Sequence, residues 1–378
     1  MSANYKKLGD IVELIDERNK DGKVQNLIGV SIDKCFIKSV ANTIGTDLTK
    51  YQVIRKNDFA CSLMQVSRDG KIPIACLKDY NEAIMSPAYY IFRIKNTNEV
   101  LPDYLAMWFM RTEFDREASY IAVGGVRGSM PWEDFCDMKL PIPDLKEQEK
   151  IVNTYNAITK RIQLKQKINE NLEKTAQCLF DEIAKNNYKS IKLKNLCTMQ
   201  YGYTETASFE PIGKKFLRIT DITNQFIDWK NVPYCQISDK DFDTYKLQTG
   251  DVVVARTGAT VGVAKIIGKN HPESVFASFL VRIKAINNLY QNIIGLAMTS
   301  KQFLNYIQMN AGGSAQPQAN PPLLGEYEVQ IPENTELKDF NMKIEKIYSE
   351  ISIQEQEIMK LQEIRQLIIS RISMENVI

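Results

Sequence analysis

Two long segments of the sequence, 144–187 and 333–378, repeat apolar residues with alternating spacings of four and three. The repeating positions are Ile151, Tyr155, Ile158, Ile162, Lys165, Asn169, Leu172, Ala176, Leu179 and Ile183, and then Phe340, Ile344, Ile347, Ile351, Gln354, Ile358, Leu361, Arg365, Ile368 and Ile372. This spacing is typical of a coiled-coil seam, and neither run contains Gly or Pro. A helix of about 38 residues is about 57 Å long. That length exceeds the needs of an ordinary core helix, so we expect the two helices to pair with each other.

Polar residues occupy one equivalent position in each seam, Lys165 in the first and Gln354 in the second. Polar seam residues cost stability but can fix the register and orientation of a coiled coil. Alternatively, the long Lys165 side chain extends along the helix and places its charge in solvent. The sequence leaves both interpretations open.

The remainder of the chain repeats as well, at an offset close to 189, which is half of 378. Residues 89–95 match 278–284, and Ile142-Pro143 matches Ile331-Pro332, both at 189; Gly124-Gly125 matches Gly312-Gly313 at 188, and Leu8 matches Leu193 at 185. Each half contains strand-like stretches (89–94; 251–255 and 278–283) and a helical one (101–110; 290–306). We therefore predict an α+β protein with domains at 1–143 and 188–332, followed by helices at 144–187 and 333–378.

The composition excludes several classes of site. His271 is the only histidine, so an HExxH zinc site or a relay of several histidines cannot be built. It stands in a Gly-Lys-Asn-His-Pro stretch that predicts an exposed loop. The seven cysteines form no CxxC pair and indicate reduced thiols. The net charge of +2 does not point to any class of partner, and without an apolar run of about 18 residues we expect a cytoplasmic protein.

Several motifs together resemble the specificity (S) subunits of Type I restriction–modification systems. Residues 140–151, Leu-Pro-Ile-Pro-Asp-Leu-Lys-Glu-Gln-Glu-Lys-Ile, are similar to the segment that begins the long helix in that family. The second copy, 329–336, lacks the Glu-Gln pair. Residues 250–262 resemble a Gly-Asp-apolar-Arg-x-Gly-x-x-Gly element of target-recognition domains. The segments 59–69, 126–130 and 311–316 also resemble parts of those domains.

The resemblance implies a fold and a function. The fold would be two pseudo-repeated α/β target-recognition domains separated by two long helices that form an antiparallel coiled coil. The function would be a non-catalytic DNA reader that recognises a bipartite target, one half-site per domain, across a spacer set by the coiled coil. Partners would be double-stranded DNA, two methyltransferase (modification) subunits and restriction/translocase subunits. S-adenosylmethionine, ATP and Mg would belong to those subunits, with no cofactor in this chain.

Base readout requires Arg, Lys, Asn or Gln side chains that loops present to the DNA grooves. The candidates are Gln65, Arg68, Lys71 and Arg127 in the first domain and Tyr201, Tyr203, Arg256, Thr257, Gln316 and Gln318 in the second. The alternatives are a stand-alone DNA adenine methyltransferase and a coiled-coil protein-interaction scaffold. Asn320-Pro321-Pro322-Leu323 partly matches the Asn-Pro-Pro-aromatic signature of adenine methyltransferases. Its fourth residue is not aromatic, so we do not expect catalysis there.

Overall fold

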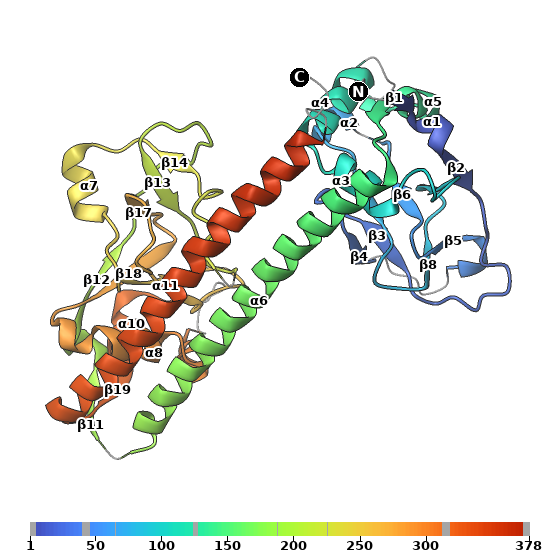
Figure 1. Cartoon of the computed structure of the whole chain (residues 1–378). Coiled ribbons are helices and arrows are strands. Elements are labelled where there is room, and N and C mark those ends of the chain that lie inside the picture. Colours follow the sequence, from blue (N-terminus) through green and yellow to red (C-terminus); the bar gives the residue numbers. More distant parts are fainter. Residues whose placement is uncertain are drawn as a thin grey trace. The chain divides into compact units, whose positions relative to one another are not determined.

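The computed structural model describes residues 5–39, 46–64, 66–123, 128–186, 188–224, 226–311 and 318–372. The chain forms two compact units, one of residues 1–162 with 360–378 and the other of residues 163–359. Each unit contains one α/β domain and part of both long helices (Figure 1). The units divide inside the helices, so the domain boundaries drawn from the sequence stay a prediction. In the described part of the chain, no helix is long and apolar enough to cross a membrane.

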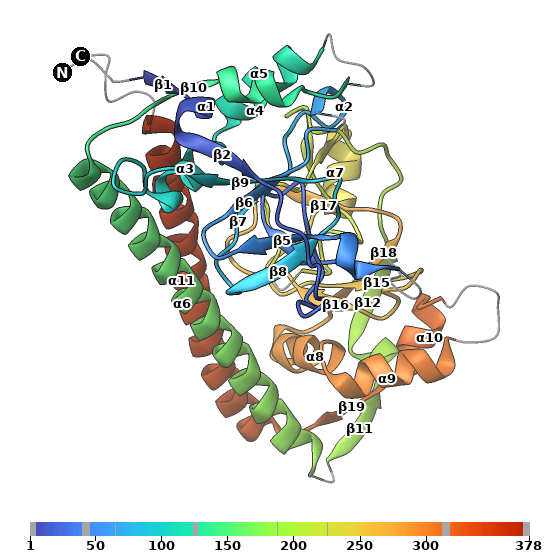
Figure 2. The ribbon, with the colours of Figure 1, turned by 90° about the vertical axis from the view of Figure 1, so that its right-hand side faces the viewer.

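The first domain is built on a four-stranded antiparallel sheet of order β2-β9-β6-β7 (Figure 2). It also contains the two-stranded sheets β1-β10, β3-β4 and β5-β8. Its elements are β1 (Tyr5–Lys7), α1 (Leu8–Ile11), β2 (Val12–Ile15), β3 (Ile28–Val30), β4 (Phe36–Lys38), η1 (Leu48–Lys50), β5 (Gln52–Arg55), β6 (Phe59–Cys61), α2 (Val66–Asp69), β7 (Ile74–Cys76), β8 (Glu82–Met85), β9 (Tyr90–Ile94), α3 (Pro102–Phe109), α4 (Thr112–Ala122), α5 (Trp132–Asp137) and β10 (Lys139–Pro141). Aromatic rings from β6, β9 and helices α3 to α5 fill its core, with Phe59, Phe92 and Phe109 fully buried.

The second domain has the same main sheet, in the order β12-β18-β15-β16, again antiparallel throughout. It adds a three-stranded sheet of order β14-β13-β17 and the pair β11-β19. Its elements are β11 (Lys189–Lys192), η3 (Leu193–Asn195), β12 (Cys197–Tyr201), β13 (Lys214–Leu217), β14 (Tyr234–Cys235), α7 (Asp239–Tyr245), β15 (Val252–Ala255), β16 (Ala264–Ile266), β17 (Ser274–Phe276), β18 (Leu280–Ala285), η4 (Asn288–Tyr290), α8 (Gln291–Met298), α9 (Lys301–Asn310), α10 (Pro321–Glu326) and β19 (Glu328–Ile331). The matching strand order confirms the internal repeat and the mixed α/β fold of each copy.

The repeat offset differs between helices and strands. Helices α3, α4 and α5 begin at residues 102, 112 and 132, and α8, α9 and α10 begin 189 residues later, at 291, 301 and 321. In the sheets, Phe59 and Val252 begin the equivalent strands β6 and β15 and pair with Phe92 and Ile283, so β9 and β18 correspond at 191 and β6 and β15 at 193. The sequence match of 89–95 with 278–284 is therefore two residues out of register. A shift of two keeps every side chain on its predicted face, because strand side chains alternate with a period of two.

The helix predicted over residues 290–306 is wrong in one respect, because it is interrupted. α8 ends at Met298 and α9 begins at Lys301. The Ser300 side chain accepts a hydrogen bond from the Phe303 N–H at 3.1 Å and so caps the second helix. A serine in this position supplies a partner for an N–H that has no acceptor within its own helix.

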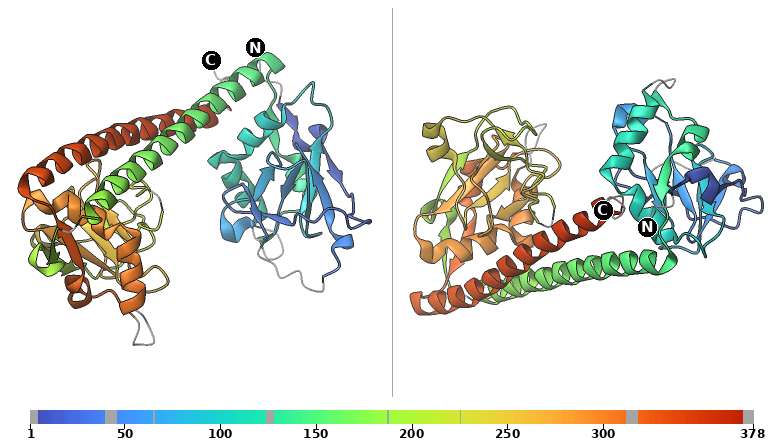
Figure 3. Two further views of the ribbon diagram at one scale, coloured as in Figure 1. Left: turned by 90° about the horizontal axis from the view of Figure 1, so that it is seen from below. Right: turned by 45° about the horizontal axis from the view of Figure 1, so that its top comes forward.

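Helices α6 (Leu145–Ala184) and α11 (Asn334–Arg371) run side by side in antiparallel directions (Figure 3). In the second unit the end of α6 packs on the start of α11, with Phe180 and Phe340 in one buried cluster. In the first unit the start of α6 meets the end of α11, where Val152 and Ile372 share a cluster. The coiled-coil prediction is confirmed.

The predicted seam residues face inward to different degrees. Those that are buried are Ile162, Asn169, Ala176, Ile183, Phe340, Ile344, Ile351, Ile358 and Ile372. Those that are half-buried are Ile151, Tyr155, Ile158, Lys165, Leu172, Leu179, Ile347, Gln354, Leu361, Arg365 and Ile368. Lys165 does not reach into solvent: its Nζ donates to Gln354 Oε1 at 2.7 Å and pairs with Glu357, and its side chain is 12% exposed. The polar seam pair therefore joins the two helices.

Candidate nucleic-acid interface

The strand order of the second domain brings distant candidate residues to one edge of the main sheet. β12 and β15 both pair antiparallel with β18, so they run parallel to each other and end at the same edge. Tyr201 is the last residue of β12, and Arg256 directly follows β15. The Arg256 guanidinium carbon lies 4.7 Å from the centroid of the Tyr201 ring. A guanidinium over an aromatic face is a cation–π pair, which holds the Arg side chain in a defined position.

Backbone contacts fix Arg256 in place. Its N–H donates to the carbonyl oxygen of Phe279 at 2.9 Å, and its own carbonyl accepts from Ala319 N–H at 2.8 Å. Its Nη1 lies 3.4 Å from the carbonyl oxygen of Ser278. The position of this arginine therefore depends on three segments that are far apart in the sequence.

A glycine permits the close approach of two of these segments. A Cβ on Gly202 would lie 2.2 Å from the carbonyl oxygen of Ala277, which is far below any normal contact. The chain after Tyr201 can therefore pass directly over the turn that precedes β18. This packing leaves Tyr201 42% exposed and Phe279 59% exposed beside Arg256.

The other candidates of the second domain have different positions. Thr257 forms an isolated antiparallel bridge with Gln318, so both lie next to Arg256. Tyr203 lies apart from this group: it packs on Tyr245 at 5.2 Å between ring centroids and contacts a buried cluster. Gln316 lies outside the described residues. We call Tyr201, Arg256, Thr257, Phe279 and Gln318 the second-domain cluster.

Sequence reasoning missed Phe279 as a candidate. It directly precedes the strand Leu280–Ala285, in a run of apolar residues that predicted a strand over 278–283. The strand begins two residues later than that prediction, so Phe279 stands in the turn and projects to solvent. The sequence signal was a large aromatic residue at a strand end, which alone does not separate a core residue from a surface one.

In the first domain, α2 lies against the segment that follows residues 124–127. Gly128 has a φ of +73°, and a Cβ there would lie 2.2 Å from Ser67 Oγ. Met130 N–H donates to the Leu63 carbonyl oxygen at 2.9 Å. Arg68 is exposed on α2 with its Nε 2.7 Å from Asp69 Oδ1, and Lys71 is exposed just beyond. Gln65 and Arg127 lie outside the described residues.

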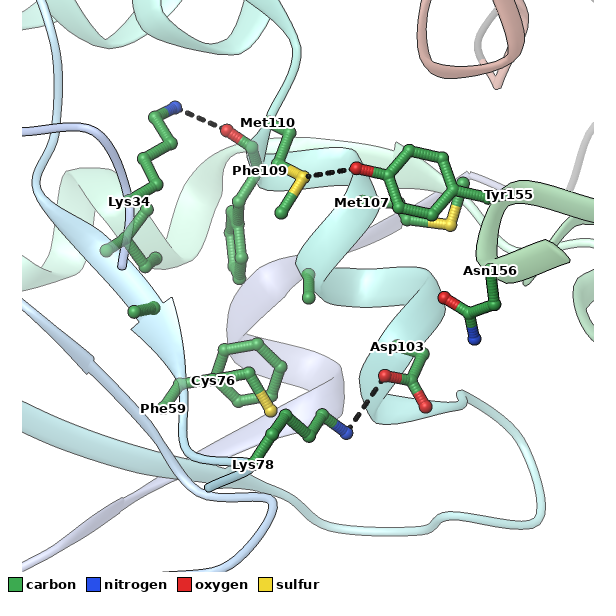
Figure 4. A pocket seen from close by; sticks show the side chains of 13 residues that line it. Lys34, Phe59, Cys76, Lys78, Asp103, Met107, Phe109, Met110, Tyr155 and Asn156 are labelled. Carbon is green, nitrogen blue, oxygen red and sulfur yellow. Dashed lines mark hydrogen bonds and ion pairs between the residues drawn. The ribbon is translucent and has the colours of Figure 1, made fainter. Parts of the chain in front are cut away.

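A cavity of about 190 Å³ lies between β7, α3 and the start of α6 in the first unit (Figure 4). Its walls are mostly apolar, and the Lys78–Asp103 ion pair (3.0 Å) and the Tyr155 hydroxyl lie at its margin. Burial raises the pKa of the Cys76 thiol in its wall to about 12, so this thiol stays protonated and unreactive at neutral pH. The cavity is thus a small, mostly apolar space between these packed elements.

Two sequence features that could suggest chemistry have structural roles. The Asn320 side chain accepts a hydrogen bond from Leu323 N–H at 3.0 Å and caps α10. His271 is half-buried, with its Nδ1 2.9 Å from the Pro272 carbonyl oxygen, so the prediction of an exposed histidine is wrong. Among the residues described, no group of three or more His, Cys, Asp or Glu side chains is placed to hold a metal ion.

Comparison with known proteins identifies the first half of the chain. Residues 3–174 match the family model of the Type I restriction modification DNA specificity domain. This part of the chain is similar to a Type I restriction–modification DNA specificity domain. This finding confirms the resemblance seen in the sequence motifs, and the matched segment extends from the first domain into α6.

Two specificity subunits are similar to the chain over part of their length. The MjaVIII specificity subunit of Methanocaldococcus jannaschii is 26% identical over 177 residues, which are 46% of this chain and 41% of that subunit. The HindI specificity subunit of Haemophilus influenzae is 28% identical over 183 residues, or 46% of this chain and 39% of that subunit. Each alignment thus spans less than half of the relative.

The fold of the whole chain is similar to that of a solved specificity subunit. The S subunit of the Type I restriction–modification system from M. genitalium superposes with a TM-score of 0.53 and covers 98% of this chain and 96% of its own. At 13% identity this likeness concerns the fold alone. The similarity in fold includes the second half of the chain, which lies beyond the segment matched by the specificity-domain model.

Proposed function

We propose that the chain is the non-catalytic DNA sequence-specificity subunit of a Type I restriction–modification complex. The observation that carries the proposal is a specificity domain whose main sheet, strand order and helices recur in the second half of the chain. A duplicated reader suits a bipartite target, because each domain can contact one half-site. The antiparallel helices are the element that sets the spacer between those half-sites.

The second-domain cluster supports DNA contact. It combines a fork-shaped guanidinium with aromatic and amide side chains at one sheet edge, and these groups suit contacts with base edges and phosphates. The proposed role of Arg256 is direct base readout, and Thr257 and Gln318 lie beside it as further hydrogen-bonding groups. Tyr203 is a weaker candidate than the sequence indicated, because it packs against Tyr245.

The proposed partners are double-stranded DNA, two methyltransferase subunits and restriction/translocase subunits. In this proposal the partner subunits carry S-adenosylmethionine, ATP and Mg, and this chain supplies no catalytic group. The role of Asn320 as a helix cap weighs against a stand-alone adenine methyltransferase, since its side-chain oxygen already accepts a hydrogen bond. A complex that acts on cellular and incoming DNA would work in the cytoplasm.

Methylome sequencing tests the proposal. We expect cells that co-express the chain with the modification subunit encoded beside it to methylate adenines in one bipartite motif with a single spacer length. Arg256→Lys keeps the charge but loses the fork, so methylation should fall by about 10-fold or more, or relax at one position of one half-site. Arg116→Ala, which removes an exposed arginine from α4, is the matched control and should change nothing.

Other outcomes would contradict the proposal. A continuous methylated motif, or no methylation in the presence of the modification subunit, would argue against a bipartite reader. Methyl transfer to plasmid DNA by the purified chain alone would show that it is an enzyme. Relaxation in both half-sites after Arg256→Lys would contradict the assignment of one half-site to each domain.

A further inference from the structure

The loop between β16 and β17 in the second domain binds the side of α11. Within this loop, residues 268–272, Asn270 Nδ2 donates to the carbonyl oxygen of Ser352 at 2.7 Å. Asn270 Oδ1 accepts from Gln356 Nε2 at 2.8 Å, so both ends of the Asn270 amide bond the helix. Lys269 Nζ lies 3.0 Å from Ser349 Oγ, one turn earlier on α11. We call residues 268–272 the clamp loop.

A charged group lies beside the clamp loop. Lys265 is on β16, the edge strand of the main sheet; it is half-buried and feels the negative charges of Glu173 on α6 and Glu355 on α11. Burial raises the pKa of both carboxyls, and the positive charge of Lys265 opposes that rise. Asn270 Nδ2 lies 3.5 Å from Glu355 Oε2, so the clamp loop and the charged group are continuous. The hydrogen bonds of the clamp loop thereby join this side of the second domain to α11.

The second domain is attached to the helices at another place as well. Asn341, near the start of α11, donates from Nδ2 to the Leu289 carbonyl oxygen at 2.8 Å and accepts from Asn292 Nδ2 at 3.1 Å. Gln356 is 15 residues further along α11, which corresponds to about 22 Å of helix. A body held at two points this far apart cannot rotate about either point alone.

The corresponding loop of the first domain has different contacts. The loop after β7, residues 77–81, places Lys78 against Asp103 at 3.0 Å and Asn57 at 2.9 Å, both within its own domain. The cavity beside Tyr155 occupies the space between the sheet edge and α6. Lys78 thus binds groups of its own domain, whereas Asn270 in the second domain binds α11.

We propose that the clamp loop, with Asn270 as its central positioning residue, fixes the angle of the second domain on the helices and thereby restricts the DNA spacer that the protein accepts. This inference rests on the proposed function. One added base pair moves a half-site by about 3.4 Å along the DNA axis and turns it by about 35°. A domain that is free to swing on its helices can follow such a change, whereas a domain fixed at two points cannot.

The test uses the full chain with its modification subunit. Methylome sequencing of the wild type defines the two half-sites and the spacer, and DNA duplexes with that spacer and with one base pair more or fewer then serve as binding probes. We expect the wild type to prefer its own spacer by about 10-fold or more, and Asn270→Ala to reduce that preference to about 3-fold, because two hydrogen bonds are lost. Affinity for the correct spacer should change less than the preference does.

Matched variants separate positioning from general damage. Asn81→Ala removes an exposed asparagine from the corresponding loop of the first domain and should leave the spacer preference unchanged. Gln356→Ala removes one of the two Asn270 bonds and should have an intermediate effect. Hydrogen exchange of the clamp loop in Asn270→Ala reports directly whether the loop has left α11.

The outcomes distinguish the inference from the function on which it rests. A wild type that methylates no bipartite motif contradicts the proposed function. A wild type with a strict spacer whose preference survives in Asn270→Ala, while hydrogen exchange shows a released loop, overturns the clamp and leaves the function intact. A released loop together with methylation at spacers one base pair longer and shorter supports the clamp.

Discussion

The two domains share one sheet order but use different residues to fix the start of the long helix that follows. In the first domain, fully buried Gln148 donates from Nε2 to the carbonyl oxygens of Glu99 and Pro143 and accepts from Leu101 N–H, at 2.8 to 2.9 Å. In the second domain, the equivalent position is Leu337, which is also fully buried. The sequence comparison had marked this loss of the Glu-Gln pair as a departure from the family pattern.

The second domain compensates one helical turn later. Asn341 stands four residues after Leu337 and bonds the backbone just before α8, as Gln148 bonds the backbone just before α3. In both domains a buried amide thus satisfies backbone groups at the junction of domain and helix. Both copies of the fold keep hydrogen-bond partners for these backbone groups, because an unpaired buried polar group costs about 1–3 kcal/mol. The identity and position of the amide side chain are free to change.

The largest expected effect comes from exchanging these residues. Gln148→Leu gives the first domain the residue type that the second domain has at this position. It leaves one N–H and two carbonyl oxygens without their partner, so we expect a loss of about 3 kcal/mol in the free energy of unfolding. Urea unfolding gives the total loss, and hydrogen exchange locates it in the first unit.

A second substitution sharpens this comparison. Val152→Asn, added to Gln148→Leu, places an amide where the second domain has Asn341, and it should recover about 1 kcal/mol if one backbone bond is restored. A Gln148→Leu variant that unfolds at the wild-type urea concentration would show that the buried amide does not hold the helix start.

A smaller effect is expected at Lys265 of the second domain, whose charge acts on Glu173 and Glu355. By strand register, Lys265 pairs with Val253 as Ala75 pairs with Ala60, so the first domain has alanine at this place. Lys265→Met leaves Glu173 and Glu355 half-buried without the positive charge that acts on both of them. We expect a loss of about 2 kcal/mol at pH 7, less than for a fully buried pair because all three groups are partly solvated.

The pH dependence has a definite sign. Both carboxyls have a pKa raised in the folded state, so their protonated forms favour folding below pH 4.5, and this contribution is lost as the pH rises through the folded values. The variant should therefore approach wild-type stability near pH 4 and fall behind it towards pH 7. Lys269→Met, which removes a neighbouring exposed lysine, should show no such trend. A deficit that is constant with pH would contradict the charge explanation.

The smallest effect concerns the helix seam. Asn169 is fully buried and neither of its amide atoms has a protein hydrogen-bond partner, whereas the equivalent position in the second helix is Ile358. Asn169→Leu replaces the amide by methyl groups of similar shape and should raise the free energy of unfolding by about 1 kcal/mol. Thermal unfolding measures the gain, and Asn171→Leu on the exposed face is the control. A loss of stability at position 169 would mean that the amide is needed in the seam.

The sequence alone determined the features that depend on local periodicity and on repetition. Heptad spacing predicted both long helices and their pairing, because a seam of apolar residues needs a partner of similar length. The duplicated layout and the family resemblance followed from motifs within each copy, and the structure and the family match confirm both. These signals lie within short stretches of chain, so no knowledge of distant contacts was required.

The tertiary structure decided what depends on residues far apart in the sequence. Strand pairing moved one repeat match by two residues, and it separated Tyr203 from Arg256 while adding Phe279 to the cluster. The sequence around His271 predicted an exposed turn, and the structure shows that this clamp loop contacts α11. Polar residues in loops carry no periodic pattern, and their partners are chosen by packing. The sequence therefore indicated the family that the chain resembles, and the fold showed which residues lie together.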